Sequence, residues 1–279
     1  MREDIFRKTN QDNLNENAQA VSSNCIAYSQ KSMEVLFKWR NPDIVTPSLL
    51  IVQPQNEGVG CCEYVKALAK AYYLQSDPRR SFEKTFLSLR YPKDISEEGI
   101  KRFFDSPRIV AEHYNRFLGV FAIEITEYLY HSESSAFVKL LEYVTSNRDE
   151  INFVFLISTD DKTAAQRMYA VINKHIRIEQ LTMEYADTKS YVSYAINLLC
   201  RNQLKYEKGV EEVLSGYIQE LAQRDSFCGY DTIIRLTDDI IYEMQCCDVL
   251  KVRKGDVEKI KDLHLKENLA LNSRNNIGF

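Results

Sequence analysis

The residues best suited to chemistry lie in the stretch 48–73, "SLLIVQPQNEGVGCCEYVKALAKAYY", where an apolar run meets a glycine turn and then a helical pattern. This is the layout of a phosphate-binding loop, which surrounds phosphate with backbone N–H groups and uses a Lys and a Ser or Thr for charge and Mg²⁺. The turn Gly58-Val59-Gly60 is present, but Cys61 and Cys62 occupy the Lys and hydroxyl positions. The alternative is an ordinary strand-to-helix turn of an unrelated α/β protein.

The segments around this loop alternate between strand and helix patterns from residue 48 to residue 183. Continuous apolar runs predict strands covered on both faces, and apolar residues three and four apart predict helices. The strand candidates are 48–53, 84–92, 120–125, 151–158 and 176–183. The helix candidates are 27–39, 61–73, 96–119, 134–147 and 161–175. This alternation predicts an α/β fold, with a mostly parallel five-stranded sheet and helices on both faces.

The pattern changes after residue 185, where helical periodicity continues with no strand candidate between the segments. The helical segments are 187–206, 210–225, 229–245 and 254–264. A small all-α domain is therefore expected after the sheet. The predicted domains are a polar N-terminal arm and helix over 1–45, the α/β domain over 46–185, and a helical domain and tail over 186–279.

The composition of the chain limits which binding partners and which cellular compartment we expect. The 279 residues, 44% of them hydrophobic, predict an ordered globular chain. A net charge of −4 provides no general attraction for nucleic acid or an anionic membrane. The seven cysteines are odd in number and lack framework spacing, which predicts reduced thiols rather than disulfides or a zinc site. No signal core or membrane-length apolar run is present, so we expect a cytoplasmic protein.

The order of the segments resembles that of the AAA+ ATPases, nearest to the group of the red-type RuBisCO activases and the stage V sporulation AAA proteins. The resemblance covers roughly residue 48 to the C-terminus. It rests on ordered motif positions: the glycine loop, the strands "FLSLRY", "VFAIEI", "INFVFLIST" and "IRIEQLTM", and the helical "GYDTIIRL". It implies a P-loop NTPase sheet followed by a helical lid, with nucleotide bound between neighbouring subunits of a ring.

The family pattern places its Walker A lysine at Cys61 and its hydroxyl residue at Cys62, so this chain lacks both groups. The Walker B strand of the family ends in Asp-Glu, a metal-positioning carboxylate and the base that activates water. This chain has Glu124 and Ile125 there, and isoleucine cannot accept a proton. Glu127 follows two residues later, but that step along a strand moves a carboxylate by about 6–7 Å, so we do not expect it to replace the base.

The remaining ATP-contacting positions of the family are partly kept. The sensor-one polar residue corresponds to Ser158 or Thr159 at the end of the strand over 151–158. In the sensor-two motif, Thr232 replaces the phosphate-facing arginine, while Arg235 matches the second arginine. Two basic residues lie near the usual position of the trans-acting arginine without a clean match, Lys174 and Arg177.

The resemblance implies a vestigial nucleotide pocket, with no catalytic residue or metal ligand expected. The pocket residues are Gly58, Val59, Gly60, Cys61, Cys62, Thr159 and Arg235. No firm cofactor is expected, although weak binding of ATP or ADP stays open.

Three functions fit this pattern. The favoured one is a catalytically degenerate AAA+-like regulatory or structural subunit, and the others are a divergent active ATPase that remodels a protein client and a scaffold with a closed pocket. The expected partners are copies of the same chain or an active AAA+ ATPase, and neither nucleic acid nor a membrane is expected.

Overall fold

The computed structural model describes residues 26–41, 47–76, 86–90, 120–125, 135–148 and 151–275. The chain divides into two compact units, one over Tyr28–Glu184 and one that combines Tyr185–Phe279 with Met1–Ala27. Glu127, the helix predicted over 96–119 and most of the predicted N-terminal arm lie outside the described residues. The two units have different architectures.

The first unit, which we call the sheet unit, is built on five parallel strands in the order β2-β3-β4-β1-β5. The strands are β1 Ser48–Gln53, β2 Phe86–Arg90, β3 Val120–Ile125, β4 Asn152–Ser158 and β5 Ile178–Thr182. Strand β1 is buried along its whole length between β4 and β5, which explains its continuous apolar sequence. The predicted α/β fold with a mostly parallel five-stranded sheet is confirmed.

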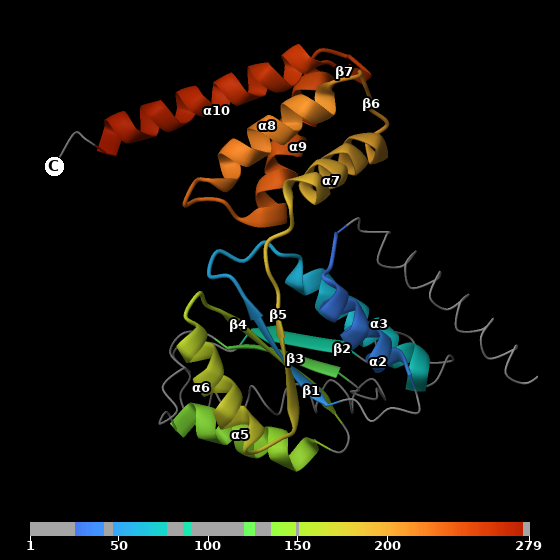
Figure 1. The fold of residues 1–279 in the computed structure, drawn as a ribbon, viewed down its shortest axis with the longest axis vertical. Coiled ribbons are helices and arrows are strands. Elements are labelled where there is room, and N and C mark those ends of the chain that lie inside the picture. Colours follow the sequence, from blue (N-terminus) through green and yellow to red (C-terminus); the bar gives the residue numbers. More distant parts are fainter. Residues whose placement is uncertain are drawn as a thin grey trace, which may run out of the picture. The chain divides into compact units, whose positions relative to one another are not determined.

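Helices cover both faces of this sheet (Figure 1). They are α2 Gln30–Arg40, α3 Cys61–Ser76, α5 Ser135–Asn147 and α6 Lys162–Asn173. The connections from β3 to β4 and from β4 to β5 run in one direction across the sheet, whereas the connection from β1 to β2 runs the other way. Because such crossovers are right-handed, α5 and α6 lie on one face and α3 lies on the opposite face. Helix α2 packs against α3.

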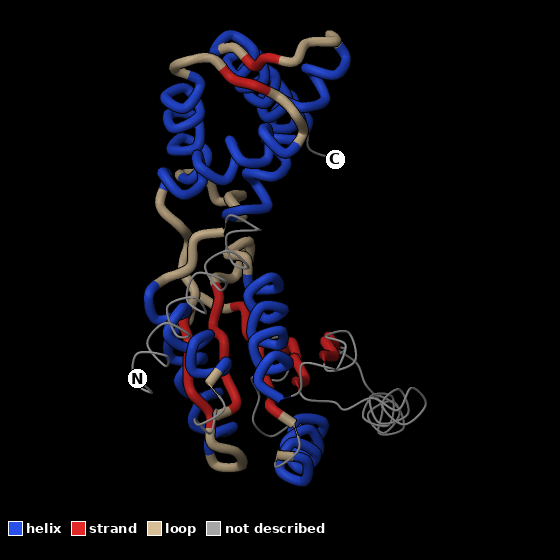
Figure 2. Tube along the Cα trace, turned by 90° about the vertical axis from the view of Figure 1, so that its right-hand side faces the viewer, coloured by secondary structure: helices blue, strands red, loops and turns tan. Residues whose placement is uncertain are grey.

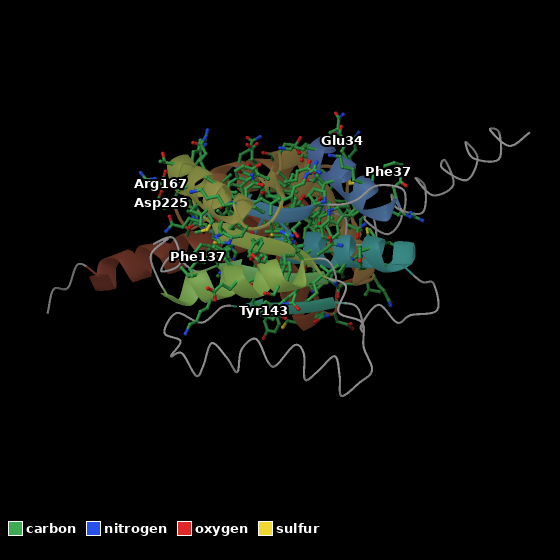
Figure 3. All side chains as sticks on the ribbon, turned by 90° about the horizontal axis from the view of Figure 1, so that it is seen from below. Glu34, Phe37, Phe137, Tyr143, Arg167 and Asp225 are labelled. Carbon is green, nitrogen blue, oxygen red and sulfur yellow. The ribbon has the colours of Figure 1, made fainter. Side chains whose placement is uncertain are left out.

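The main core lies between the sheet and the helices α5 and α6. Alternate residues of β1, β3 and β4 face this side and pack with Phe137 from α5. Tyr143, also from α5, contacts the rings of Phe121 and Phe153 edge-on, with each pair of centroids 6.4 Å apart. Figure 3 labels Phe137 and Tyr143 on α5. This packing fixes the strands whose carboxyl ends carry the candidate site.

The second unit, which we call the helical unit, contains α7 Thr188–Arg201, α8 Val210–Ala222, α9 Gly229–Cys246 and α10 Lys254–Asn275. It also holds a two-residue parallel pair, β6 Lys205–Tyr206 and β7 Lys251–Val252, which the helical sequence pattern did not predict (Figure 2). Two residues are too few to show a strand periodicity, so only the approach of the two connections reveals the pair. None of the described helices is both long and apolar enough to cross a membrane.

Candidate functional site

The loop between β1 and α3 has the backbone shape of a glycine turn that opens a helix. Gly58 and Gly60 have φ values of 70° and 76°, in the left-handed region where a side chain is strained. Glu57 also has a positive φ, 57°, and its N–H donates to the carbonyl of Pro54 at 2.9 Å. Helix α3 then begins at Cys61. The glycines are therefore required by the turn, whether or not a ligand binds.

A chain of side-chain hydrogen bonds holds this loop to the end of β4. The Gln53 Nε2 donates to the Ser158 hydroxyl at 3.0 Å, and that hydroxyl donates to Oε1 of Glu57 at 3.2 Å. The Thr159 hydroxyl instead accepts from the N–H of Asp161 at 3.1 Å, in the turn that leads into α6. Of the two sensor-one candidates, Ser158 is therefore the one bonded to the loop, and its bond ends on a carboxylate.

Two tyrosines join the start of α3 to the start of α2. The Tyr28 hydroxyl donates to the carbonyl of Gly60 at 3.1 Å. In the other direction, the Tyr64 hydroxyl donates to the carbonyl of Ser32 at 2.7 Å. The two rings lie 5.1 Å apart between centroids. Protein groups thus hold the loop from the α2 side, and we call this pair of contacts the tyrosine exchange.

At the position where the resemblance predicts a lysine, the chain has the buried thiol of Cys61, and carboxylates lie near it. Cys61 is only 5% exposed, and burial raises the pKa of its thiol well above the usual value. Negative charge on Cys62, Glu57, Glu63 and Glu124 raises that pKa further. A neutral thiol cannot neutralise phosphate, and the nearby carboxylates oppose the approach of an anion. The local charge is thus the reverse of that in a phosphate site.

Cys62 follows at the exposed surface of the same helix start. Partial burial raises the pKa of its thiol, Glu63 adds to the shift, and Lys66 acts in the opposite direction. Lys66 is exposed one turn further along α3, so it supplies a positive charge beside the thiol rather than at the loop.

The two Walker B positions lie on opposite faces of β3. Glu124 is close enough to Cys61 and Cys62 to influence the pKa of both thiols. Ile125 is 2% exposed and packs in the core with residues of α5 and α6, on the other face. Alternation along a strand produces this result, because successive side chains point to opposite faces. Glu124 therefore belongs to the candidate site and Ile125 does not.

The sensor-two positions lie in the helical unit, at the beginning of α9. The Thr232 hydroxyl accepts from the N–H of Cys228 at 2.8 Å, so it stabilises the first turn of the helix. Arg235 is exposed on α9. Thr232, predicted to stand at the position of the phosphate-facing arginine, thus has a structural partner within its own unit.

Lys174 and Arg177, the two candidates for a trans-acting arginine, are exposed in the connection between α6 and β5. This connection lies at the amino ends of the strands, because Ile178 pairs with Ser48, the first residue of β1. The glycine loop follows the carboxyl end of β1, about 20 Å away along the strand. Neither side chain can serve the loop of its own chain.

Comparison with known proteins supports a fold rather than a family. No protein-family profile matches the sequence, and no curated protein matches it. Among solved structures, the Thermotoga maritima RuvB Holliday junction branch migration motor matches with a TM-score of 0.55 and 14% identity, over 85% of this chain and 70% of that one. Domain III of the Thermotoga maritima replication initiation protein DnaA matches with a TM-score of 0.53 and 10% identity, over 82% and 89% of the two chains. Both neighbours are AAA+ ATPases.

The chain has the AAA+ fold. Within this AAA+ fold, the structure brings together the loop from Gly58 to Cys62, Glu124 and the end of β4. Sequence reasoning missed the tyrosine exchange and the buried Gln53, which has only 7% of its surface exposed. Tyr28 precedes Gly60 by 32 residues, so no local spacing could have indicated their contact. The opposite facing of Glu124 and Ile125, by contrast, follows from strand alternation alone.

Proposed function

We propose that this chain is a catalytically degenerate AAA+-like protein that acts as a regulatory or structural subunit. The observation that supports this most directly is the buried Cys61 thiol, which stands in place of the Walker A lysine among Glu57, Glu63 and Glu124. The loop keeps its glycine shape, yet its polar contacts go to protein groups. The fold is retained, while the charge that would hold nucleotide is absent.

The expected losses are large. A charged phosphate contact contributes about 1.5–3 kcal/mol of binding, which Cys61 cannot supply. A general base contributes roughly 10²–10⁴ in rate, and the corresponding residue, Ile125, is buried in the core. With both missing, ATP or ADP binds weakly at most, and hydrolysis does not reach a useful rate.

Assembly is the role that such a chain can still perform. AAA+ proteins typically form oligomers. The exposed Lys174 and Arg177 lie at the amino ends of the strands, away from the loop of their own chain. In a ring they could face the nucleotide of a neighbouring active AAA+ subunit. We therefore infer protein partners, either copies of this chain or an active AAA+ ATPase. RuvB is named for action at Holliday junctions, but the net charge of −4 offers this chain no general attraction for DNA.

The finer assignments belong to the same proposal. They are the kinship with the RuBisCO-activase and stage V sporulation group, a cytoplasmic location, and division into 1–45, 46–185 and 186–279. In that division the segment 1–45 supplies partner-specific contacts and the last segment acts as the lid.

ATP turnover by the purified full-length chain tests the proposal. We expect phosphate release no faster than the buffer background, both for the native chain and for Glu124→Gln. Turnover above background that disappears in Glu124→Gln would contradict the proposal, because it would show that Glu124 still supports hydrolysis. That result would favour the divergent ATPase, which the retained φ values of Gly58 and Gly60 also fit.

Calorimetric titration with ADP separates the degenerate subunit from a scaffold whose pocket is closed. The native chain is compared with the double variant Cys61→Lys and Cys62→Thr, which restores the charge and the hydroxyl. If the loop shape is open to phosphate, the variant gains about 10–150-fold in affinity. No gain would favour the scaffold, in which the Glu57–Ser158 bond and the tyrosine exchange close the loop. Micromolar ADP binding by the native chain would count against both.

A further inference from the structure

The polypeptide passes between the two units twice, once between Ala27 and Tyr28 and once between Glu184 and Tyr185. On the side of the helical unit, a tyrosine hydroxyl holds the backbone at each passage. The N–H of Ala27 donates to the Tyr230 hydroxyl at 2.9 Å. The N–H of Ala186 donates to the Tyr191 hydroxyl at 3.1 Å. Neither donor lies in a helix or strand, so each hydroxyl is the partner that fixes its passage.

The two tyrosines belong to one aromatic cluster. The rings of Tyr191 and Tyr230 meet edge to face with centroids 4.9 Å apart, and Tyr194 contacts Tyr230 at the same distance. Phe227 contacts both Tyr191 and Tyr185, each with centroids 5.6 Å apart. The cluster therefore extends from the Ala27 anchor on Tyr230 to the first residue after the second passage, Tyr185.

Both hydroxyls are well placed to act as fixed acceptors. Tyr191 and Tyr230 are each 2% exposed, and burial raises the pKa of both phenols, so they remain neutral at ordinary pH. Ile26, next to the Ala27 anchor, is also buried. Because an aromatic ring buried on several sides has little freedom to move, displacing one ring disturbs its neighbour.

We propose that Tyr191 and Tyr230 form a shared clamp on the helical unit that holds both passages of the chain, so that the two passages loosen together. This inference is independent of nucleotide chemistry. It assigns a conformational role to Tyr230, the residue that follows Gly229 at the start of α9.

Hydrogen exchange measured by mass spectrometry on the full-length chain tests the clamp. Tyr230→Phe removes one hydroxyl and keeps the ring, and Tyr191→Phe is its counterpart. Loss of one hydrogen bond should raise exchange at its own passage by roughly 2–10-fold. A shared clamp requires that each variant also raise exchange at the other passage. A rise confined to the variant's own passage would overturn the proposal, because it would show two independent bonds. Tyr242→Phe, on α9 and 69% exposed, is the matched control and should change neither passage.

Discussion

The tyrosine exchange at the loop makes a direct prediction about stability, which Tyr64→Phe tests. Tyr64 is 0% exposed, and its hydroxyl donates to the carbonyl of Ser32 at 2.7 Å. The variant loses this buried bond and leaves a gap of one oxygen atom. The Ser32 carbonyl lies in the first turn of α2, so it keeps its partner within the helix and is not orphaned. The expected loss is therefore that of one net hydrogen bond, about 1 kcal/mol of unfolding free energy.

Urea unfolding followed by the fluorescence of Trp39 is a suitable assay. Trp39 is the only tryptophan, is 1% exposed in α2, and contacts the Tyr72 ring of α3. Its emission therefore reports on the α2–α3 packing that the exchange supports. A loss of 1 kcal/mol lowers the midpoint by about 0.3–1 M. Tyr242→Phe, on the exposed surface of α9, should leave the midpoint unchanged.

Two outcomes would refute this reasoning. The first is a midpoint for Tyr64→Phe within about 0.1 M of the native value, well below the expected shift. The second concerns Tyr28→Phe, which removes the reciprocal bond to Gly60. Neighbouring groups that support one another show coupling of roughly 0.5 kcal/mol or more in a double-mutant cycle. Strict additivity of the two substitutions would mean that the two bonds act separately and that the exchange does not hold the loop as a unit.

Further predictions concern the thiols and the core. Burial and nearby carboxylates raise the pKa of Cys61, so the folded state keeps a proton that the unfolded chain releases above pH about 8.5. The unfolding free energy should then fall as pH rises from about 8.5 to 9.5, and Cys61→Ala should show a smaller fall in urea titrations. Iodoacetamide followed by peptide mapping should modify exposed Cys62 in the native chain and Cys61 only after unfolding; equal labelling would contradict the buried position. Phe155→Ala, at a fully buried core position, should lower the unfolding free energy by about 3–5 kcal/mol in the same urea assay.

Local sequence patterns predicted much of the sheet unit because burial on both faces leaves a direct record in composition. Strands β1, β3 and β4 are continuous apolar runs, and each lies between two neighbouring strands of the sheet. Helix α6 begins where Asp161 caps its first turn, at a position the alternating pattern had already indicated. By contrast, β6 and β7 are two residues each, and no periodicity could reveal them.

The candidate site was predicted in part. The glycine turn follows from residue types alone. The sequence prediction grouped Ile125 with Glu124 at the loop, whereas Ile125 packs in the core on the other face of β3, as alternation along a strand requires. The choice of Ser158 over Thr159 as the residue bonded to the loop depended on hydrogen bonds that join β1, β4 and the loop. The roles of these residues, and of Arg235 on α9, remain predictions until nucleotide binding is measured.

The sequence by itself determined the α/β order of the sheet unit and which residue types, Cys61, Cys62 and Ile125, stand where the AAA+ resemblance predicts a lysine, a hydroxyl and a base. Both follow from residue type and spacing, because these decide the local propensity and the burial of each segment. Only the tertiary structure decided what surrounds Cys61, which tyrosines hold the loop, and which hydroxyls hold the two passages between the units. These contacts join residues from separate elements, most of them far apart in the chain, and their free energy depends on the burial and geometry that the packed fold creates.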